Sequence, residues 1–238
     1  MINGKKILAV IPARLGSKGL KKKNIKLINN KPLINYSISS SKKSKLLDKI
    51  FVSTESEEIK QIAEKQNIKV DFLRPRYLAK DQSKTFDVVK HTILQLEKKN
   101  FFFDYVALIE PTSPIRKKND IDRAIKLLNK NSSNFDAVIS LGEVKETPNI
   151  LNKIKSKNKI VKAFSSLKKI HRRQDAEKYY FPYGVIYIAK IKSFLKEETF
   201  YCERSMGMLI DRFQCYEIDD INDFICTELI LKKYKKLL

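Results

Sequence analysis

An uninterrupted apolar run at residues 7–11 ends at Pro12 and leads directly into a basic loop that contains Gly16 and Gly19. A run of this length is typical of a strand buried on both faces in the middle of a parallel sheet, and proline ends such a strand. Glycines let a loop backbone bring its amide N–H groups close to an anion. The segment therefore predicts an α/β fold with an anion-binding loop after its first strand.

The side chains of this loop indicate which anion it binds. Arg14, Lys18 and Lys23 supply positive charge, and Ser17 supplies a hydroxyl group. Such a loop is suited to a triphosphate, as in a nucleotide site. Its glycine spacing matches neither GxGxxG nor GxxxxGK[ST], so it differs from the two commonest phosphate-binding loops.

Strand and helix patterns alternate along the rest of the chain, which predicts a mostly parallel sheet flanked by helices. We expect strands at residues 7–11, 49–53, 70–73, 105–109, 135–141, 181–189 and 214–218, and helices at 32–41, 56–66, 85–98, 118–130 and 221–234. The alternation breaks at about residues 142–180, where KIKSKNKIVKAF has the pattern of an exposed hairpin. The chain is thus expected to form one domain, residues 1–238, with an insertion at about 142–180.

Polar motifs follow several of these strands. Residues 14–24 follow the first strand, Arg74 the third and residues 110–116 the fourth, while Glu217 and Asp219 close the last. Open parallel sheets bind ligands beyond the carboxyl ends of their strands. We therefore expect these motifs to meet at one edge of the sheet.

Composition limits the alternatives. The formal net charge is +22, from 49 basic and 27 acidic residues. The lysines are scattered along the chain and no nucleic-acid-binding motif is evident, so a solvated basic surface is favoured over a nucleic-acid site. No apolar segment approaches the roughly 20 residues that span a bilayer. The three cysteines and two histidines show no metal-ligand spacing: they are Cys202, Cys215, Cys226, His91 and His171. A cytoplasmic protein is expected.

Six segments in order carry a resemblance to a known family. They are IPARLGSKGLKKKN at residues 11–24, FLRPRYLAKD at 72–81, LIEPTSPIR at 108–116, RRQ at 172–174, GVIYI at 184–188 and EIDDINDF at 217–224. Together they resemble the CMP-sialic acid synthetases (acylneuraminate cytidylyltransferases), which join CTP to a nonulosonic acid and release pyrophosphate. The resemblance implies a Rossmann-like fold of the nucleotide-diphospho-sugar transferase type, and a homodimer in which the insertion packs against the second subunit and helps to shape the sugar pocket.

The resemblance and the chemistry of nucleotidyl transfer assign roles to individual residues. Catalysis is expected from Arg14, Lys23 and Asp219, and nucleotide binding from Arg14, Ser17, Lys18, Asn24, Arg74 and Thr85. A Mg²⁺ ion is expected at Glu217 and Asp219, because Mg²⁺ takes one or two carboxylates together with substrate phosphates. The sugar acid is expected to contact Glu110, Arg173, Gln174 and Tyr187. Alternatives stay open: Arg172 is a rival to Arg173 for the sugar carboxylate, Arg74 can be a surface residue, and Tyr187 an ordinary strand residue.

Three positions depart from the family pattern. Glu110 stands where glutamine is usual, Tyr183 where asparagine is common, and Glu217 where the family has the first aspartate of Asp-x-Asp. The acidic pair that binds the metal is therefore not fixed by sequence. The first two changes suggest an acceptor other than ordinary N-acetylneuraminate, such as legionaminate or pseudaminate. Two competing functions are a CMP-KDO synthetase and a non-catalytic protein that binds CTP or nucleic acid.

Overall fold

The central sheet is built around strand β1 (Ile7–Pro12), whose residues 7–11 are completely buried. The computed structural model describes residues 1–164, 172 and 177–238. Strand β1 pairs in parallel with β4 (Lys49–Ser53) on one side and with β5 (Tyr105–Leu108) on the other. All three strands were predicted, and the two-sided burial of β1 explains its unbroken apolar sequence.

Three further strands complete the six-stranded sheet, whose order is β10-β6-β9-β5-β1-β4. Their bounds are Ala137–Glu143 for β6, Tyr180–Lys190 for β9 and Ser205–Leu209 for β10. Strand β9 runs antiparallel to both β5 and β6, whereas β10 pairs with β6 in parallel. The sheet is therefore mostly parallel, as predicted, with one reversed strand near its centre.

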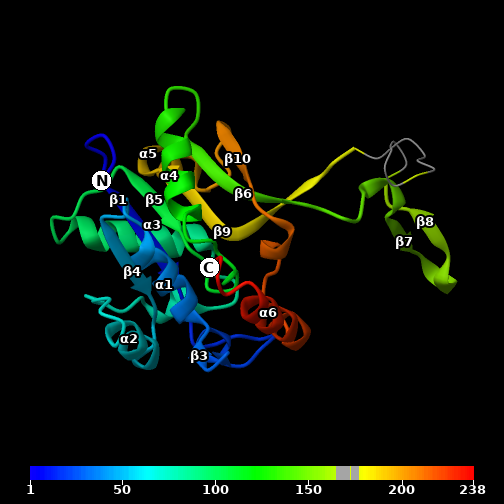
Figure 1. Ribbon diagram of the computed structural model, residues 1–238, viewed down its shortest axis with the longest axis horizontal. Coiled ribbons are helices and arrows are strands. Elements are labelled where there is room, and N and C mark those ends of the chain that lie inside the picture. Colours follow the sequence, from blue (N-terminus) through cyan, green and yellow to red (C-terminus); the bar gives the residue numbers. More distant parts are fainter. Residues whose placement is uncertain (165–171, 173–176) are drawn as a thin grey trace.

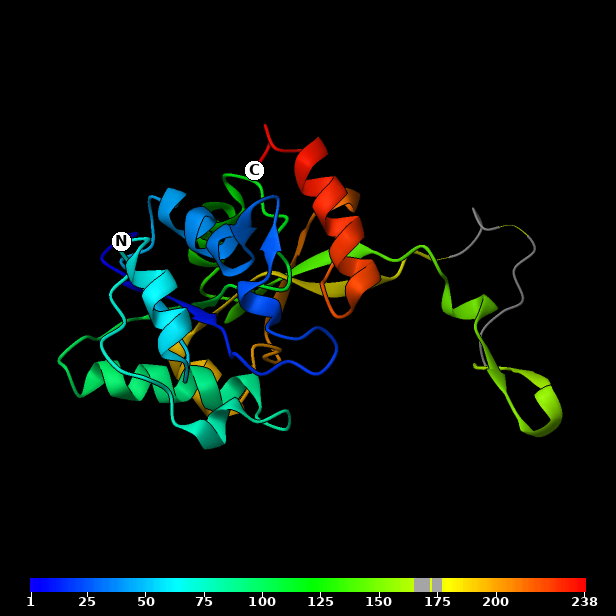
Figure 2. The same ribbon diagram turned by 90° about the horizontal axis from the view of Figure 1, so that it is seen from below.

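Helices lie on both faces of this sheet, with α1 and α6 on one side and α3 on the other (Figure 2). The α-helices of the described residues are α1 (Ile34–Lys43), α2 (Glu57–Glu64), α3 (Thr85–Glu97), α4 (Asp120–Lys130), α5 (Ile191–Glu197) and α6 (Ile221–Lys233). Ser56 caps α2 by accepting a hydrogen bond from the Ile59 amide at 3.4 Å. Asn119 forms no such side-chain cap on α4. In the described part of the chain no helix is both long and apolar enough to cross a bilayer.

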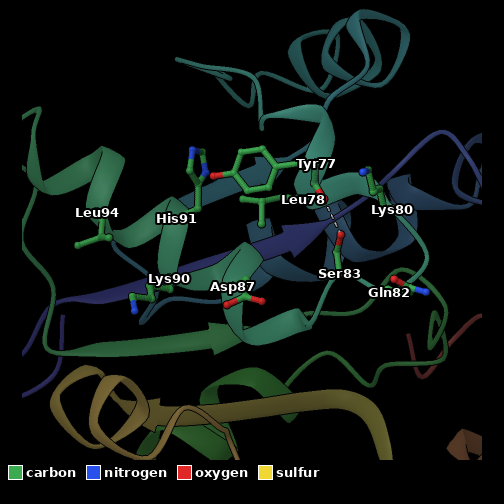
Figure 3. Close-up of a pocket in the computed structure, with 9 residues that line it drawn as sticks. All are labelled: Tyr77, Leu78, Lys80, Gln82, Ser83, Asp87, Lys90, His91 and Leu94. Atoms are coloured by element: carbon green, nitrogen blue, oxygen red, sulfur yellow. Dashed lines mark hydrogen bonds between the residues drawn. The ribbon is translucent and has the colours of Figure 1, made fainter.

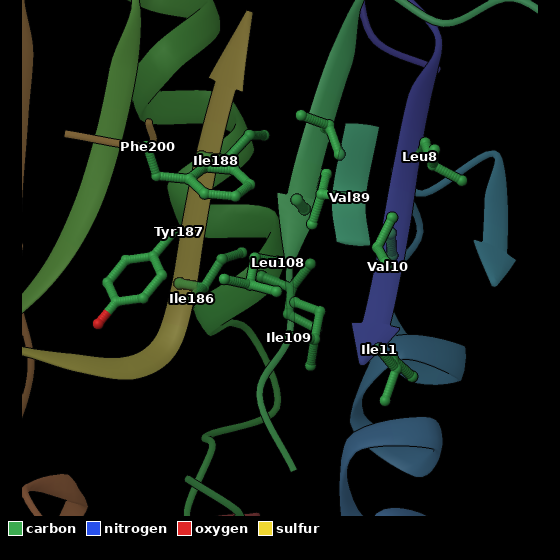
Figure 4. Packing of buried hydrophobic residues seen from close by; sticks show 14 of the residues in the cluster. Leu8, Val10, Ile11, Val89, Leu108, Ile109, Ile186, Tyr187, Ile188 and Phe200 are labelled. Carbon is green, nitrogen blue, oxygen red and sulfur yellow. The ribbon is translucent and has the colours of Figure 1, made fainter. Parts of the chain in front are cut away.

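Two apolar clusters hold these layers together. The larger one contains both faces of the sheet, including Val10 of β1, Leu108 of β5 and Ile188 of β9 (Figure 4). A smaller cluster joins α6 to the segments beside the first loop and consists of Ile28, Leu33, Ile115, Ile218, Phe224 and Leu231. Because Ile218 is fully buried in it, the neighbouring Asp219 is held at a fixed place next to the loop after β1.

Two expected strands are not formed. Residues 70–73 form no strand and bend at Phe72, whose ring stacks on that of Phe51 with centroids 4.4 Å apart. Residues 214–218 are also not a strand, because Arg212–Gln214 forms a short 3₁₀ helix whose N-terminus carries a capping box between Asp211 and Gln214. Strand β10 and helix α5 were not predicted.

Several short elements connect the larger ones. Strands β2 (Leu27–Ile28) and β3 (Lys31–Pro32) form a hairpin whose turn residues, Asn29 and Asn30, have φ of 47° and 61°. Asparagine tolerates this left-handed conformation better than most residues. Further short helices are Lys23–Ile25, Arg76–Ala79, Pro148–Ile150 and Ser156–Asn158.

An arm projects from the body between β6 and β9 (Figure 1). Its described part contains the antiparallel hairpin of β7 (Asn152–Ile154) and β8 (Ile160–Lys162), which confirms the predicted hairpin. Ile154 and Ile160 pair across it and are 75% and 68% exposed. An isolated two-stranded hairpin is at best marginally stable in water.

Candidate functional site

A cleft of about 640 Å³ opens at the carboxyl edge of the sheet. It brings together the loop after β1, the segment before α3, the residues after β5 and the segment before α6. The predicted site residues that line it are Arg14, Ser17, Lys18, Lys23, Asn24, Arg74, Thr85, Glu110 and Asp219. Lys23 and Asp219, which are 196 residues apart in sequence, thus meet at one place, as the rule for open parallel sheets predicts.

The glycine loop touches the acidic segment directly. A Cβ atom added to Gly19 would lie 2.3 Å from the backbone oxygen of Asp219, so only glycine fits without displacing one of the two segments. Lys23 Nζ donates to Ile218 O at 2.5 Å and pairs with Asp219 Oδ1 at 3.2 Å. The Lys23 side chain is 13% exposed and that of Asp219 84% exposed. The ammonium is therefore fixed at the wall of the cleft while the carboxylate remains accessible.

Arg14 and Lys18 share a carboxylate. Asp81 Oδ1 lies 2.7 Å from Arg14 Nη1, and Asp81 Oδ2 lies 2.9 Å from Lys18 Nζ. Hydrogen bonds from Lys18 and Arg14 lower the pKa of Asp81. Asp81 is the last residue of the FLRPRYLAKD motif, whose pattern does not indicate a role for it, and the structure places it against two of the expected phosphate-binding cations.

Glu55 connects the glycine loop to Arg74. Its Oε1 accepts a hydrogen bond from the Leu15 amide at 2.8 Å, and its Oε2 pairs with Arg74 Nη2 at 3.1 Å. Arg74 is only 5% exposed, so the surface alternative is wrong. Burial lowers the pKa of Arg74, and the Glu55 carboxylate opposes this shift. The sequence does not indicate this role of Glu55, because a single acidic residue after strand β4 has no distinguishing pattern.

Asn24 has a structural contact of its own. Its Nδ2 donates to Arg14 O at 2.8 Å, and the residue is 7% exposed. The amide group thus closes the loop from residue 14 to residue 24 from within. Its described side-chain contact is with the loop backbone, so the nucleotide-binding role expected for Asn24 stays a prediction.

Glu110 lines the cleft, whereas Glu217, a predicted metal ligand, is not among its lining residues and lies close enough to Glu110 to affect its charge. Burial, followed by the nearby charge of Glu217, raises the pKa of Glu110 to about 7. The Glu110 side chain packs against Gly184, where an added Cβ would lie 2.0 Å from its Oε2. Glu217 Oε1 accepts hydrogen bonds from Ser113 Oγ at 2.8 Å and from the Gly184 amide at 2.6 Å. One oxygen of Glu217 is therefore committed to holding two neighbouring segments.

Arg116, the largest fully buried side chain among the described residues, supports the cleft beside Glu110. Its Nη2 donates to Glu110 O at 2.9 Å and to Gly184 O at 3.1 Å, and its Nε donates to Val185 O. The guanidinium therefore ties the loop after β5 to strand β9. Arg116 is the last residue of the LIEPTSPIR motif, whose pattern alone does not indicate this role.

The remaining predicted sugar-binding residues do not line the cleft in the part of the chain that the structure describes. Tyr187 is 7% exposed, and its ring packs beside Phe200 and Tyr201, with centroids 6.2 and 5.9 Å away. Figure 4 shows this tyrosine on strand β9 next to the apolar core, as the strand-residue alternative predicts. Arg173 and Gln174 lie outside the described residues, as does His171. Arg172 is described and exposed, and it does not line the cleft.

A second hollow, of about 490 Å³, lies on the other side of the segment before α3 (Figure 3). Tyr77 and His91 face each other across it, and Leu78, Lys80 and Ser83 line both this hollow and the cleft. Burial lowers the pKa of His91, whose ring packs edge-on against Phe72. This contact gives His91 a structural role.

Comparisons with known proteins agree with this arrangement. A family model described as cytidylyltransferase matches residues 8–237. The N-acylneuraminate cytidylyltransferase of Escherichia coli is 33% identical over 231 residues, which are 96% of this chain and 52% of the relative. The CMP-N,N'-diacetyllegionaminic acid synthase of Legionella pneumophila is 32% identical over 234 residues, covering 95% of this chain and 97% of the relative. The chain thus spans about half the length of the first relative and nearly all of the second.

A solved structure extends the agreement to the fold. CMP:2-keto-3-deoxy-manno-octonic acid synthetase complexed with CTP superposes with a TM-score of 0.68 at 13% identity, over 96% of this chain and 99% of the other. A mostly parallel sheet with a cationic glycine loop at its carboxyl edge defines the class of α/β proteins that bind phosphorylated ligands at that edge. Within this class, the chain belongs to the cytidylyltransferase family.

Proposed function

We propose that the protein transfers CMP from CTP to the anomeric hydroxyl group of a nonulosonic acid and releases pyrophosphate. The observation that carries this proposal is the contact between the glycine loop and Asp219, because it combines phosphate-binding amides and cations with an accessible carboxylate. The names of the E. coli and L. pneumophila relatives support the same reaction. Three free cysteines, two of them buried, are compatible with an enzyme of the reducing cytoplasm.

In this reaction the anomeric hydroxyl group loses its proton and its oxygen forms a bond to the α-phosphorus of CTP, while the bond between that phosphorus and the bridging oxygen of pyrophosphate breaks. Negative charge builds up on the phosphate oxygens as this occurs. Lys23 Nζ is held by Ile218 O at the wall of the cleft and is placed to neutralise charge at the α-phosphate. Arg14, with Ser17 and Lys18, is placed to hold the remaining phosphates.

The site also fits the expected Mg²⁺ ion. Mg²⁺ is commonly bound by one or two carboxylates plus substrate phosphates, and Asp219 offers an exposed carboxylate at the cleft wall. Glu217 has only Oε2 left for a metal, since Oε1 holds Ser113 and Gly184. We therefore propose Asp219 as the main protein ligand and Glu217 as the secondary one. Bound Mg²⁺ would screen the triphosphate charge and lower the pKa of a coordinated hydroxyl group.

Glu110 bears on the identity of the acceptor. It lines the cleft and, with a pKa near 7, can present either a carboxylate or a carboxylic acid to a sugar substituent. Tyr183 does not line the cleft, and its ring packs edge-on against Phe181 with centroids 5.1 Å apart, so of these two departures only Glu110 lines the cleft. We propose an acceptor with substituents unlike those of N-acetylneuraminate, with legionaminate and pseudaminate as the leading cases. Arg172 and Arg173 remain alternative partners for its carboxylate.

The direct test is pyrophosphate release from CTP with a panel of acids: N-acetylneuraminate, legionaminate, pseudaminate and KDO. Turnover with a nonulosonic acid that requires both CTP and Mg²⁺ supports the proposal, and turnover with KDO alone would replace it with the CMP-KDO synthetase function. Absence of turnover with all four acids, together with strongly salt-dependent nucleic-acid binding, would favour the binding protein instead.

Two lysines next to each other in sequence provide a matched control. Lys23→Ala is expected to lower kcat by at least about 100-fold and to change CTP affinity less, because the ammonium acts on charge that develops during transfer. Lys22→Ala is expected to have less than about a threefold effect, since Lys22 pairs with the exposed Glu58. Asp219→Ala should abolish Mg²⁺-dependent turnover, and normal turnover by this variant would refute the metal assignment.

We also propose that the protein is a homodimer joined through the arm. The β7–β8 hairpin exposes Ile154 and Ile160, and residues Ile150, Leu151 and Phe164 beside it are 55%, 42% and 49% exposed. A second copy of the chain would bury these side chains, which supports the role that the family resemblance gives to the insertion. Light scattering should give twice the chain mass of 27.7 kDa, and Ile154→Asp/Ile160→Asp should give the monomer mass. A monomer before substitution would refute the dimer.

A further inference from the structure

A third cavity, of about 470 Å³, lies between helices α1 and α6 and shares no described lining residue with the cleft. Both views place α1, α6 and the C-terminal end of the chain close together (Figures 1 and 2). Its walls come from the β2–β3 hairpin, from α1, from the segment after β5 and from the end of α6. Cavities of this volume are in the range that holds small ligands.

The charged side chains that line this cavity are all basic among the described residues: Lys31, Lys43, Arg116, Lys232 and Lys235. Lys31, Lys232 and Lys235 line it, and none of the three has a hydrogen bond or ion pair with residues 1–164, 172 or 177–238. Lys43 also lines it, and its Nζ donates to Leu238 O at 2.8 Å. The nearby carboxylate of Glu228 accepts a hydrogen bond from the Asn29 amide at 2.8 Å.

The arrangement of the lysines favours a single anion. Lys232 lies in the last turn of α6 and Lys235 lies just beyond its end, and both line the cavity. Lys31 approaches the cavity from the β2–β3 hairpin. Like charges brought together repel one another, and an anion between them removes that repulsion. A phosphate group can accept hydrogen bonds from all three ammonium groups.

Uncharged groups indicate that the anion carries hydroxyl groups. Asn35 lines the cavity, and its buried Oδ1 has no hydrogen-bond partner among the described residues. A buried acceptor without a donor is unfavourable, and a ligand hydroxyl could supply the donor. Ser39 and Ser40 line the same wall.

We propose that this cavity is a second binding site, separate from the cleft, for a small phosphorylated sugar. Lys31, Lys232 and Lys235 bind its phosphate, and Asn35 accepts a hydrogen bond from one of its hydroxyl groups. The site does not depend on the reaction proposed for the cleft.

Ribose 5-phosphate is a suitable probe. Titration of the ¹⁵N-labelled 238-residue chain should shift the amide signals of residues 29–43 and 231–238, and saturating CTP should leave these shifts in place. Unphosphorylated ribose should produce none of them. If ribose 5-phosphate at about 20 mM shifts only signals of residues that line the cleft, the proposal is wrong.

Two pairs of lysines at the end of α6 provide the control. Lys232→Ala/Lys235→Ala removes two lining ammonium groups, and Lys233→Ala/Lys236→Ala removes the same charge from neighbouring positions that do not line the cavity. The first pair should weaken ribose 5-phosphate binding by at least about tenfold and the second by less than about threefold. Equal weakening by both pairs would show attraction to the overall positive charge and would overturn the proposal. The spectrum of each unliganded variant reports whether it is folded.

Discussion

The link between Glu55 and Arg74 allows a quantitative prediction. Their side chains are 15% and 4% exposed, and the charged atoms lie 3.1 Å apart. At an effective dielectric constant of about 20, unit charges at this distance attract by roughly 5 kcal/mol. Glu55→Gln removes the attraction but recovers part of the cost of burying a carboxylate, so we expect the free energy of unfolding to fall by about 3 kcal/mol. The bond from the Leu15 amide can persist, because glutamine retains one acceptor oxygen.

Urea denaturation at fixed protein concentration measures this loss. With a slope of about 3 kcal/mol per molar, the midpoint should fall by roughly 1 M. Glu58→Gln makes the same chemical change at an exposed pair, since Glu58 and Lys22 are 47% and 51% exposed. We expect this control to cost less than about 1 kcal/mol, including any loss of the favourable interaction with the N-terminus of α2.

The comparison of the two variants can refute the reasoning. If Glu55→Gln costs no more than Glu58→Gln, the buried pair contributes nothing beyond a surface pair, and Arg74 is held by its packing alone. The same variants can be titrated with CTP. Because Glu55 supports both Leu15 in the loop and Arg74 in the cleft, its substitution should weaken CTP binding, whereas Glu58→Gln should leave it unchanged.

Three further predictions concern the cleft. The pKa of Glu110, raised from 4.5 to about 7, means that the folded state holds this proton more tightly than the unfolded state. The free energy of unfolding should therefore fall by roughly 2–3 kcal/mol between about pH 5 and pH 8. If the free energy of unfolding of Glu110→Gln changes with pH as steeply as that of the unsubstituted protein, this prediction is wrong. Gly19→Ala should lower kcat/KM by at least about tenfold because its methyl group collides with Asp219 O. Gly16→Ala should have a clearly smaller effect, since a Cβ atom added there meets no atom within 4 Å. Equal activities of the two variants would argue against the close contact. Asp81→Asn should lower the KM for CTP by about two- to fivefold at low ionic strength, because it removes a negative charge beside Arg14, and the effect should be smaller in high salt. A higher KM would instead mean that Asp81 orients this arginine.

Sequence patterns were sufficient to predict the structure of segments in which one local property of the residues determines the fold. The run at residues 7–11 could only be buried, and the structure places it at the centre of the sheet. Residues 214–218 alternate like a strand, but the side chain of Gln214 bonds to Asp120 and to Ile115 O, far away in sequence, and the backbone turns into a short helix. Tertiary contacts of this kind override a local period of two.

The site was predicted where charge and spacing are distinctive, and missed where a residue acts through another. Arg14, Lys23 and Asp219 belong to recognisable motifs and meet in the cleft. Glu55 belongs to no motif, and Arg116 belongs to one that does not indicate its role, because the importance of both residues lies in the buried groups that they connect. Such residues become visible only when the distances between distant segments are known.

The reversed strand β9 has a consequence for synthesis of the chain on the ribosome. It is the strand that joins β4-β1-β5 to β6-β10, and it is made only when residues 180–190 emerge. Until then the nascent chain can form the β4-β1-β5 part of the sheet, but β5 and β6 both lack the neighbour that β9 will later provide. The two parts of the sheet therefore join late in synthesis. Before they join, a partly made chain is most prone to associate with other nascent chains.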